Sequence, residues 1–147
     1  MNELPKLNLP PIRLRAKRVE GVLYIWDSLR RRYLLLTPEE WVRQHVIGYL
    51  MTHRNIPAVN IIQEYPVNIN GMPQRADIVV MDSDMRPLML VECKATDVEI
   101  DDKVFEQAVR YNSVVQAQYI LLTNGKRHYT FCRESGDYRQ LSDFPQL

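Results

Sequence analysis

The chain is predicted to form one α/β domain, in which helices pack on a mixed central sheet and a small antiparallel β meander precedes that core. Its 147 residues suit a single compact domain. From Thr37 onward the apolar spacing follows the order helix, three strands, helix, two strands. Before Thr37, three strand-like runs alternate with turn residues. We therefore expect a basic meander over 1–36, an α/β core over 37–134 and a C-terminal tail over 135–147.

The N-terminal part is predicted to be an irregular lead-in followed by three strands. The lead-in "LPKLNLPPI" is rich in proline. The runs "IRLRAKRV", "GVLYIWD" and "RRYLLLT", from Ile12 to Leu36, are separated by Glu20-Gly21 and Asp27-Ser28. Short strand-like runs with turn residues between them are typical of an antiparallel meander.

The segment "TPEEWVRQHVIGYLMTH" carries the strongest helix-start signal in the chain. Thr37 can cap the helix, and Pro38 suits its first position. Glu39 and Glu40 favour the positive end of the helix dipole. Apolar residues then recur at helical spacing, and this helix should end near Asn55.

The spacing of apolar residues predicts the remaining strands and the second helix. The run "VNIIQEYPVNI" predicts a strand and "NGMP" a turn. The apolar runs Ile78–Met81 and Leu88–Val91 predict two more strands with a polar turn between them. "DDKVFEQAVRYNSVVQ" predicts a second helix. "QYILLTNGKRHYTFCRE" predicts two strands about an Asn-Gly turn, the strongest short hairpin signal.

Composition limits the class of protein. With 46% hydrophobic and 25% charged residues, the chain has the make-up of an ordinary globular domain. No apolar stretch approaches the roughly 20 residues of a membrane span, and the N-terminus lacks the apolar core of a secretory signal, so we expect a cytoplasmic protein without membrane contact. Cys93 and Cys132 form no CxxC pair, which favours two reduced thiols over a zinc site or a disulfide scaffold.

Charge is distributed unevenly along the chain. Residues 1–36 hold eight Lys or Arg against three acidic residues, whereas the remainder holds eleven against fifteen. A basic arm on an acidic body suits a protein that grips a polyanion with one part and binds cations with another. The alternative is that these cations are the solvent face of an amphipathic strand. The residues expected to contact phosphate are Arg13, Arg15, Lys17, Arg18, Arg30, Arg31 and Arg32.

Three ionisable groups stand at the edges of the two central apolar runs. Asp77 precedes the first run, and Glu92 and Lys94 close the second. Side chains alternate along a strand, so Glu92 and Lys94 share a face, and Asp77 can lie beside Glu92 across the hairpin. Two neighbouring carboxylates need a compensating cation, either Lys94 or a divalent metal such as Mg²⁺ or Mn²⁺. The set suits phosphodiester hydrolysis, and the alternative is a salt-bridge cluster on a sheet edge.

Asp77 followed by Glu92-Cys93-Lys94 resembles the signature of the PD-(D/E)xK nuclease superfamily, although Arg75-Ala76 replaces the usual proline before Asp77. Gln107 and Tyr111, four residues apart on one helical face, resemble the QxxxY element of RecB-like members. The predicted element order matches the restriction-endonuclease-like αβββαβ core. The succession "TPEEWVRQ", "RADIVV", "VECKA" and "EQAVRYN" is similar to the N-terminal nuclease domain of type I restriction enzyme R subunits.

This resemblance implies a role for each matching residue. Asp77 and Glu92 would bind Mg²⁺ or Mn²⁺, with the backbone carbonyl of Cys93 as a third ligand, and Lys94 would position water or stabilise charge. Glu40 would match the acidic residue that the first core helix supplies. Gln107 and Tyr111 would orient Lys94 or touch the substrate backbone, unless Tyr111 is simply a core residue. Glu64 either points into the same cleft or is a solvent-facing strand residue.

The resemblance also implies DNA as a partner. The sequence has no GxxxxGK phosphate loop, so a motor would come from other restriction or repair subunits. A homodimer is a further expectation, by analogy with proteins in which one active site cuts one strand. The alternative to a metal-dependent endonuclease is a catalytically silent nucleic-acid-binding or partner-docking module of nuclease fold.

Overall fold

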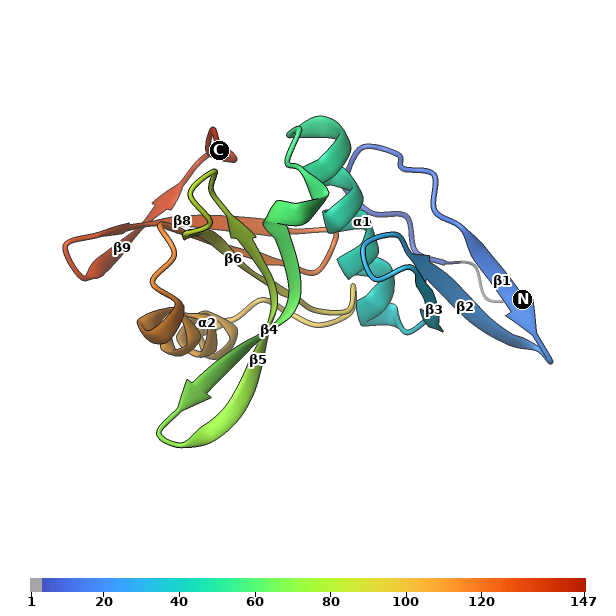
Figure 1. Cartoon of the computed structure of the whole chain (residues 1–147), viewed down its shortest axis with the longest axis horizontal. Helices are drawn as coiled ribbons and strands as arrows, with labels where there is room; N and C mark the ends of the chain where they lie inside the picture. Colours follow the sequence, from blue (N-terminus) through green and yellow to red (C-terminus); the bar gives the residue numbers. More distant parts are fainter. Residues whose placement is uncertain (1–3) are drawn as a thin grey trace.

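The computed structural model describes residues 4–147 as two β-sheets and two long helices (Figure 1). The smaller, antiparallel sheet consists of β1 (Ala16–Val19), β2 (Val22–Asp27) and β3 (Arg32–Leu35). The larger sheet consists of β4 (Ile61–Ile69), β5 (Met72–Met81), β6 (Pro87–Cys93), β7 (Tyr119–Thr123), β8 (His128–Glu134) and β9 (Asp137–Leu141). The helices are α1 (Pro38–His53), the short 3₁₀ helix η1 (Ala58–Asn60) and α2 (Asp102–Val115).

The larger sheet is mixed, as the sequence predicted. Its strands lie in the order β4-β5-β6-β7-β8-β9. Strands β6 and β7 pair in parallel, and the other neighbours pair antiparallel. Two parallel neighbours need a crossover connection, and α2 provides it. The order α1, β4, β5, β6, α2, β7 is the predicted αβββαβ succession, so the fold-class prediction is confirmed.

The two helices pack against different residues of the larger sheet, because neighbouring residues of a strand face opposite sides of the sheet. In β6, Val91 belongs to the apolar cluster that contains Val42 and Leu50 of α1. Its neighbour Leu90 belongs to the cluster that contains Ala108 of α2. Successive strand side chains point to opposite faces, so α1 and α2 cover opposite faces of the sheet. Burial of each such aliphatic side chain stabilises the fold by about 1.5–3 kcal/mol.

Local capping sets the start of both helices. Thr37 Oγ1 accepts a hydrogen bond from the Glu40 N–H (3.0 Å), which is the N-cap expected from the sequence. Asp101 Oδ1 accepts one from the Val104 N–H (3.1 Å) at the start of α2. Helix α1 ends at His53, two residues before the predicted end.

The first predicted strand is shorter than expected. It begins at Ala16 rather than Ile12. The carbonyl of Arg15 still accepts a hydrogen bond from the N–H of Trp26 (2.8 Å), whereas Ile12 packs on α1. A Cβ built on Gly48 of α1 would lie 2.8 Å from two side-chain carbons of Ile12. Gly48 therefore leaves the space that Ile12 fills, and this contact holds the lead-in against the helix.

The hairpin turns differ in how well the sequence predicted them. The Asn70-Gly71 turn connects β4 and β5 with only two residues, both at positive φ (51° and 80°), as a tight hairpin requires. The connection between β7 and β8 is longer than the expected two-residue Asn-Gly turn, because pairing ends at Thr123 and His128. Asn124 Oδ1 there accepts bonds from two backbone N–H groups across the loop, at 3.0 and 2.9 Å.

Two further elements were not predicted. Strand β9 lies within the segment expected to be a tail, and it pairs with β8 from Thr130↔Leu141 to Glu134↔Asp137. The 3₁₀ turn η1 precedes β4. Both cysteines are free and buried, as expected. Among the helices of residues 4–147, none is long and apolar enough to cross a membrane.

Candidate functional site

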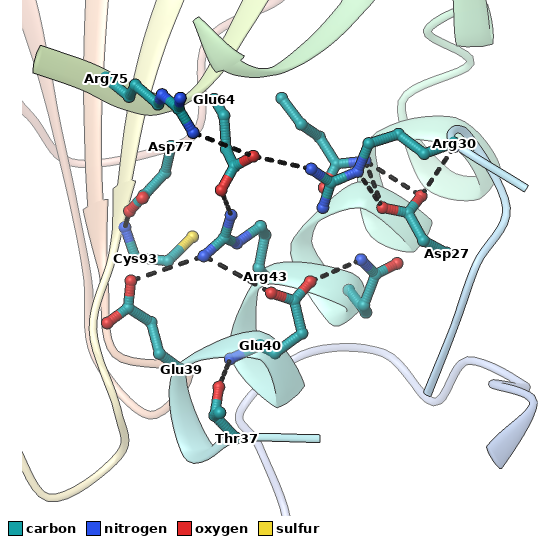
Figure 2. Close-up of polar contacts among 12 residues, drawn as sticks. Asp27, Arg30, Thr37, Glu39, Glu40, Arg43, Glu64, Arg75, Asp77 and Cys93 are labelled. Atoms are coloured by element: carbon teal, nitrogen blue, oxygen red, sulfur yellow. Dashed lines mark hydrogen bonds and ion pairs between the residues drawn. The ribbon is translucent and has the colours of Figure 1, made fainter. Parts of the chain in front are cut away.

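The two carboxylates that the sequence paired lie together, joined through the backbones of β5 and β6. The N–H of Cys93 donates to Asp77 Oδ2 (2.7 Å), and the N–H of Asp77 donates to Glu92 Oε1 (3.3 Å). Figure 2 shows the first of these contacts. Each carboxylate is thus held by a backbone group beside its neighbour, which fixes the two acids in close proximity.

The site is electrostatically unfavourable for two negative charges. Glu92 is only 5% exposed, whereas Asp77 is half-buried. Burial, and after it the charge of Asp77, raises the pKa of Glu92 to about 9. Without a compensating cation, Glu92 therefore carries a proton at neutral pH. Burial also raises the pKa of the Cys93 thiol, so this thiol stays protonated, and Cys93 can offer its backbone carbonyl as a ligand.

Lys94 follows β6 directly and is half-buried. Its N–H donates to the carbonyl of Thr123 (2.9 Å), which extends the pairing with β7 by one residue. The positive charge of Lys94 acts to lower the pKa of Glu92. The Lys94 ammonium is therefore close enough to the carboxylates to interact with them electrostatically. The backbone at this end of β6 thus holds the three predicted residues close together.

Glu39, one of the two acidic residues at the start of α1, has a pKa that the charge of Asp77 affects. Burial and then the charge of Asp77 raise the pKa of Glu39, while Lys94 is among the charges that lower it. Glu40, the residue chosen from the sequence, is buried beside other groups: its Oε1 accepts from Gln44 Nε2 (2.8 Å). The signal that could have identified Glu39 is the acidic pair itself, but its helical phase could not be assigned before the position of the sheet was known.

Arg43 lies at the centre of a cluster of acidic residues formed by Glu39, Glu40 and Glu64. The sequence analysis did not identify it. Its guanidinium is 3.6 Å from Glu39, 3.5 Å from Glu40 and 3.8 Å from Glu64, although its side chain is only 10% exposed (Figure 2). Burial alone would lower the pKa of Arg43, but Glu40 and Asp77 outweigh it and raise that pKa. An arginine one turn after two glutamates was the available sequence signal.

Glu64 turns toward arginines from three different elements. Its carboxylate lies 2.9 Å from Arg30, 3.8 Å from Arg43 and 3.9 Å from Arg75. Glu64 falls between two paired positions of β4 and therefore opposite Asp77 of β5. Its φ of 50° is left-handed, which costs a non-glycine residue about 1–3 kcal/mol. The ion pairs offset this strain, and Glu64 lies beside the cluster rather than in open solvent.

Gln107 and Tyr111 of α2 form the chain of side chains that their spacing predicts. Gln107 Nε2 donates to Tyr111 Oη (3.3 Å), which donates to Gln74 Oε1 of β5 (3.3 Å). Burial and then the charges of Glu92 and Asp77 raise the pKa of Tyr111. The hydroxyl thus lies near the carboxylates, beside an open hollow of about 290 Å³ that Gln74, Gln107 and Tyr111 help to line.

The predicted phosphate contacts divide into two groups. Six of the seven basic residues are exposed: Arg13, Arg15, Lys17, Arg18, Arg31 and Arg32. Arg30 differs, because its Nε lies 2.7 Å from the fully buried Asp27 and its Nη1 lies 2.9 Å from Glu64. Arg30 therefore joins the small sheet to β4 and has little freedom to meet a phosphate.

Residues 38–145 match the sequence profile of the family described as the type I restriction enzyme R protein N terminus (HSDR_N). The chain belongs to this family. The match covers both long helices and the strands of the larger sheet, so the resemblance to the N-terminal domain of type I restriction enzyme R subunits is confirmed. The meander of the HSDR_N chain precedes the matched residues.

A solved structure shares the fold of this HSDR_N domain. It is a fragment described as an HsdR subunit of a type I restriction enzyme from Vibrio vulnificus YJ016, with a TM-score of 0.56 and 23% sequence identity. The similarity covers 76% of this chain and 24% of that one, so the domain spans about a quarter of the fragment. No curated protein matches the chain.

The donor chemistry of the HSDR_N site fits a hard divalent cation. Within residues 4–147, no group of three or more His, Cys, Asp or Glu side chains forms a complete metal site. Mg²⁺ is, however, commonly held by one or two carboxylates, with waters and substrate phosphates filling the remaining positions. Asp77 and Glu92 supply such a pair. Burial first, and then the charge of Asp77, raises the pKa of Glu92, and a bound cation would compensate that charge.

Proposed function

We propose that this domain is a metal-dependent deoxyribonuclease of the PD-(D/E)xK type, which hydrolyses phosphodiester bonds as part of a restriction system. The observation that carries the proposal is the pairing of Asp77 and Glu92 through two backbone hydrogen bonds. A structural ion-pair cluster does not need two carboxylates so close that one must be protonated. A site that binds a cation does need them.

The residues of the candidate site would have separate roles in the proposed hydrolysis. Asp77 and Glu92, with the Cys93 carbonyl, would hold Mg²⁺ or Mn²⁺, which supplies Lewis-acid stabilisation of the phosphoryl oxygens and a more acidic water. Lys94 would position the attacking water and stabilise negative charge that develops as the bond from water oxygen to phosphorus forms and the bond to the leaving sugar oxygen breaks.

Surrounding residues would keep this geometry in place. Glu39, which the charge of Asp77 reaches, would accept a hydrogen bond from water at the same site, beside Glu40, the acidic residue that the resemblance implies for the first core helix. Tyr111 and Gln107 would contact the substrate backbone from α2, because both line an open hollow and the charges of Glu92 and Asp77 reach Tyr111. Arg43 would hold Glu39 and Glu64 at fixed distances.

DNA is the proposed substrate, in keeping with the restriction-enzyme family. Other restriction or repair subunits are proposed partners, since the 147 residues contain no GxxxxGK loop that could drive translocation. A homodimer would bring two such sites to the two strands of a duplex.

A second candidate function is a silent module that keeps the fold and docks nucleic acid or a partner without turnover. Arg43 favours it, because this buried guanidinium already compensates part of the acidic charge, as in a structural ion-pair cluster. Under this alternative the cluster would stabilise the domain and have no need of a metal.

Calorimetry with MnCl₂ and a plasmid-nicking assay on the same samples distinguish the two. We compare the wild type with Asp77→Ala, Glu92→Ala and the exposed control Asp137→Ala. The nuclease proposal expects Mn²⁺ binding and nicking to be lost together in the first two variants and retained in the control. Binding without nicking indicates a site that needs its partner subunits. Absence of binding, with and without DNA, establishes the silent module.

A further inference from the structure

The small sheet presents one face on which aromatic, aliphatic and basic side chains gather. Directly paired residues of an antiparallel sheet share a face, and so do alternate residues of one strand. The pairs Lys17↔Tyr24, Tyr24↔Leu35 and Trp26↔Tyr33 therefore define a common surface, the meander face. By this alternation, the meander face comprises Arg15, Lys17, Val19, Val22, Tyr24, Trp26, Tyr33 and Leu35.

The opposite face of the same sheet is the one that packs on the rest of the domain. Ile25 and Asp27 of that face are fully buried. On the meander face, by contrast, Val19, Val22 and Leu35 are 45%, 42% and 55% exposed. The meander face therefore exposes large apolar side chains that the domain itself does not cover.

Cations lie over the aromatic rings of this face. The rings of Trp26 and Tyr33 pack edge to face with centroids 5.0 Å apart. Lys17 Nζ lies 4.1 Å from the centroid of Tyr33, and the Arg15 guanidinium lies 5.3 Å from that of Trp26. One face of each ring thus carries a cation, so a base that stacks on that face takes the place of the cation, which is then free to pair with the adjoining phosphate.

An open hollow of about 570 Å³ adjoins Trp26, between the lead-in and α1. Arg13 and Arg15 contribute to its lining on the basic side, and Ile47 and Met51 contribute apolar surface from α1. The hollow thus offers a charged rim and an apolar wall side by side. The charged rim is complementary to a phosphate, and the apolar wall is complementary to the flat face of an unstacked base.

We propose that the meander face binds single-stranded nucleic acid, with bases stacked on Tyr24, Trp26 and Tyr33 and phosphates paired with Arg13, Arg15 and Lys17. Proteins that bind single strands combine stacking side chains with a positive groove in this way. The bases of an intact duplex are already stacked on each other and cannot reach the rings, so a duplex gains only the phosphate contacts. The inference rests on the proposed function for the class of the ligand, and it shares no residue with the carboxylate site.

Charge distinguishes this ligand from a protein partner. The residues that define the meander face include Arg15 and Lys17 and no acidic side chain, and Arg13 lines the hollow beside it. A surface with this excess of cations is complementary to a polyanion. Figure 1 shows the meander on the opposite side of the molecule from α2.

Fluorescence anisotropy with labelled dT20 and a 20-base-pair duplex tests the proposal, in EDTA so that no cleavage occurs. Wild type should bind dT20 at least tenfold more tightly than the duplex. Tyr33→Ala and Trp26→Ala should each weaken dT20 binding about tenfold, since one stacked base contributes about 1–3 kcal/mol, and should change duplex binding less than twofold. Tyr33→Phe, which keeps the ring, should bind as wild type, and thermal melts should confirm that each variant folds.

A charge-matched pair separates local contacts from net charge. Arg15→Gln/Lys17→Gln should reduce the slope of log K against log salt by about 1.4, the value for two phosphate contacts on a single strand. Arg86→Gln/Lys103→Gln, which removes the same charge from exposed positions in the β5–β6 turn and on α2, should leave that slope within error of wild type.

Three results would overturn the inference: equal affinity for dT20 and duplex, dT20 binding unaffected by Tyr33→Ala and Trp26→Ala, or no dT20 binding at low salt. In the last case, sedimentation of the Trp26→Ala variant shows whether a second copy of the chain covers the face instead. Because these assays need no cleavage, they can succeed when plasmid nicking fails, and they can fail when nicking succeeds.

Discussion

The N–H of Cys93 donates a 2.7 Å hydrogen bond to Asp77 Oδ2, across the two central strands of the sheet. Cys93 follows Glu92 directly, so this bond holds the Asp77 carboxylate beside the Glu92 carboxylate. A backbone donor cannot rotate away as a side chain can. The charge conflict between the two acids is therefore built into the strand pairing, and four predictions follow from this cluster and its supports.

Glu92 should make the metal-free domain less stable as pH rises. Its pKa is about 9 in the folded protein and has an ordinary value of 4.5, so between these values the folded state binds more protons than the unfolded state. Stability should fall as pH rises through that window. Glu92→Gln should raise the melting temperature at pH 8 by at least about 3 °C and flatten the pH dependence. Melts of both proteins in EDTA from pH 5 to 9 measure this, and a parallel slope in the variant would contradict it.

Arg43 should be the main internal counter-charge of the cluster. Arg43→Met would leave the buried Glu40 without its cation and should destabilise the domain by about 3 kcal/mol. Arg75→Met is the matched control: Arg75 is 71% exposed and lies 3.9 Å from Glu64, so its loss should cost less than about 1 kcal/mol. Urea unfolding of both variants, of Glu40→Gln and of Glu40→Gln/Arg43→Met gives the coupling energy between Arg43 and Glu40. Equal losses for Arg43 and Arg75 would remove Arg43 from this role.

Asp27 should contribute to resistance against acid. Burial would raise its pKa, but bonds from the backbone and side chain of Arg30 and from Gln63 outweigh burial and lower that pKa below 3.8. A depressed folded pKa gives stability that is present above 3.8 and is lost as pH falls below it. Asp27→Asn should therefore cost about 2–3 kcal/mol at pH 7 and reduce the acid dependence. The exposed variant Asp97→Asn should melt as wild type throughout.

Gly48 should be required for the docking of the lead-in. In a free helix, Gly→Ala stabilises by about 1 kcal/mol, but here the new Cβ would meet Ile12 at 2.8 Å. We expect Gly48→Ala to destabilise the domain by about 1 kcal/mol. In an Ile12→Ala background the same change should become stabilising. Chemical unfolding of the four proteins of this cycle checks the change of sign, and a stabilising Gly48→Ala in the wild-type background would contradict the contact.

Local chemistry explains why much of the fold could be predicted. Thr37 and Pro38 start α1 through groups within one helical turn, and the Asn70-Gly71 pair supplies the two positive φ angles of its turn. Strand β9 escaped prediction because its exposed, polar residues lack an apolar alternation, and its position depends on pairing with β8. Ile12 was assigned to a strand by its alternation, but packing against Gly48 prevailed.

Some residues of the candidate site could likewise be paired from the sequence, and others could not. Asp77 and Glu92 could be paired from the sequence because a short hairpin connects their strands. That the charge of Asp77 reaches Glu39 could not be predicted, because the sequence does not show which face α1 turns to the sheet. The ion pair of Arg30 with Glu64 joins residues 34 positions apart, and no local pattern could predict it.

The sequence by itself determined the order of the two long helices and of strands β1 to β8, the Thr37 cap and the presence of two acids and a lysine at strand ends, because these depend on groups a few residues apart. The tertiary structure alone decided which charges meet. Glu64, Arg43 and Arg30 come from three separate elements, and only the packing of β4 against α1 and the small sheet brings them within ion-pair distance. Electrostatic energy depends on distance through space and on burial, and neither is set until the core has packed.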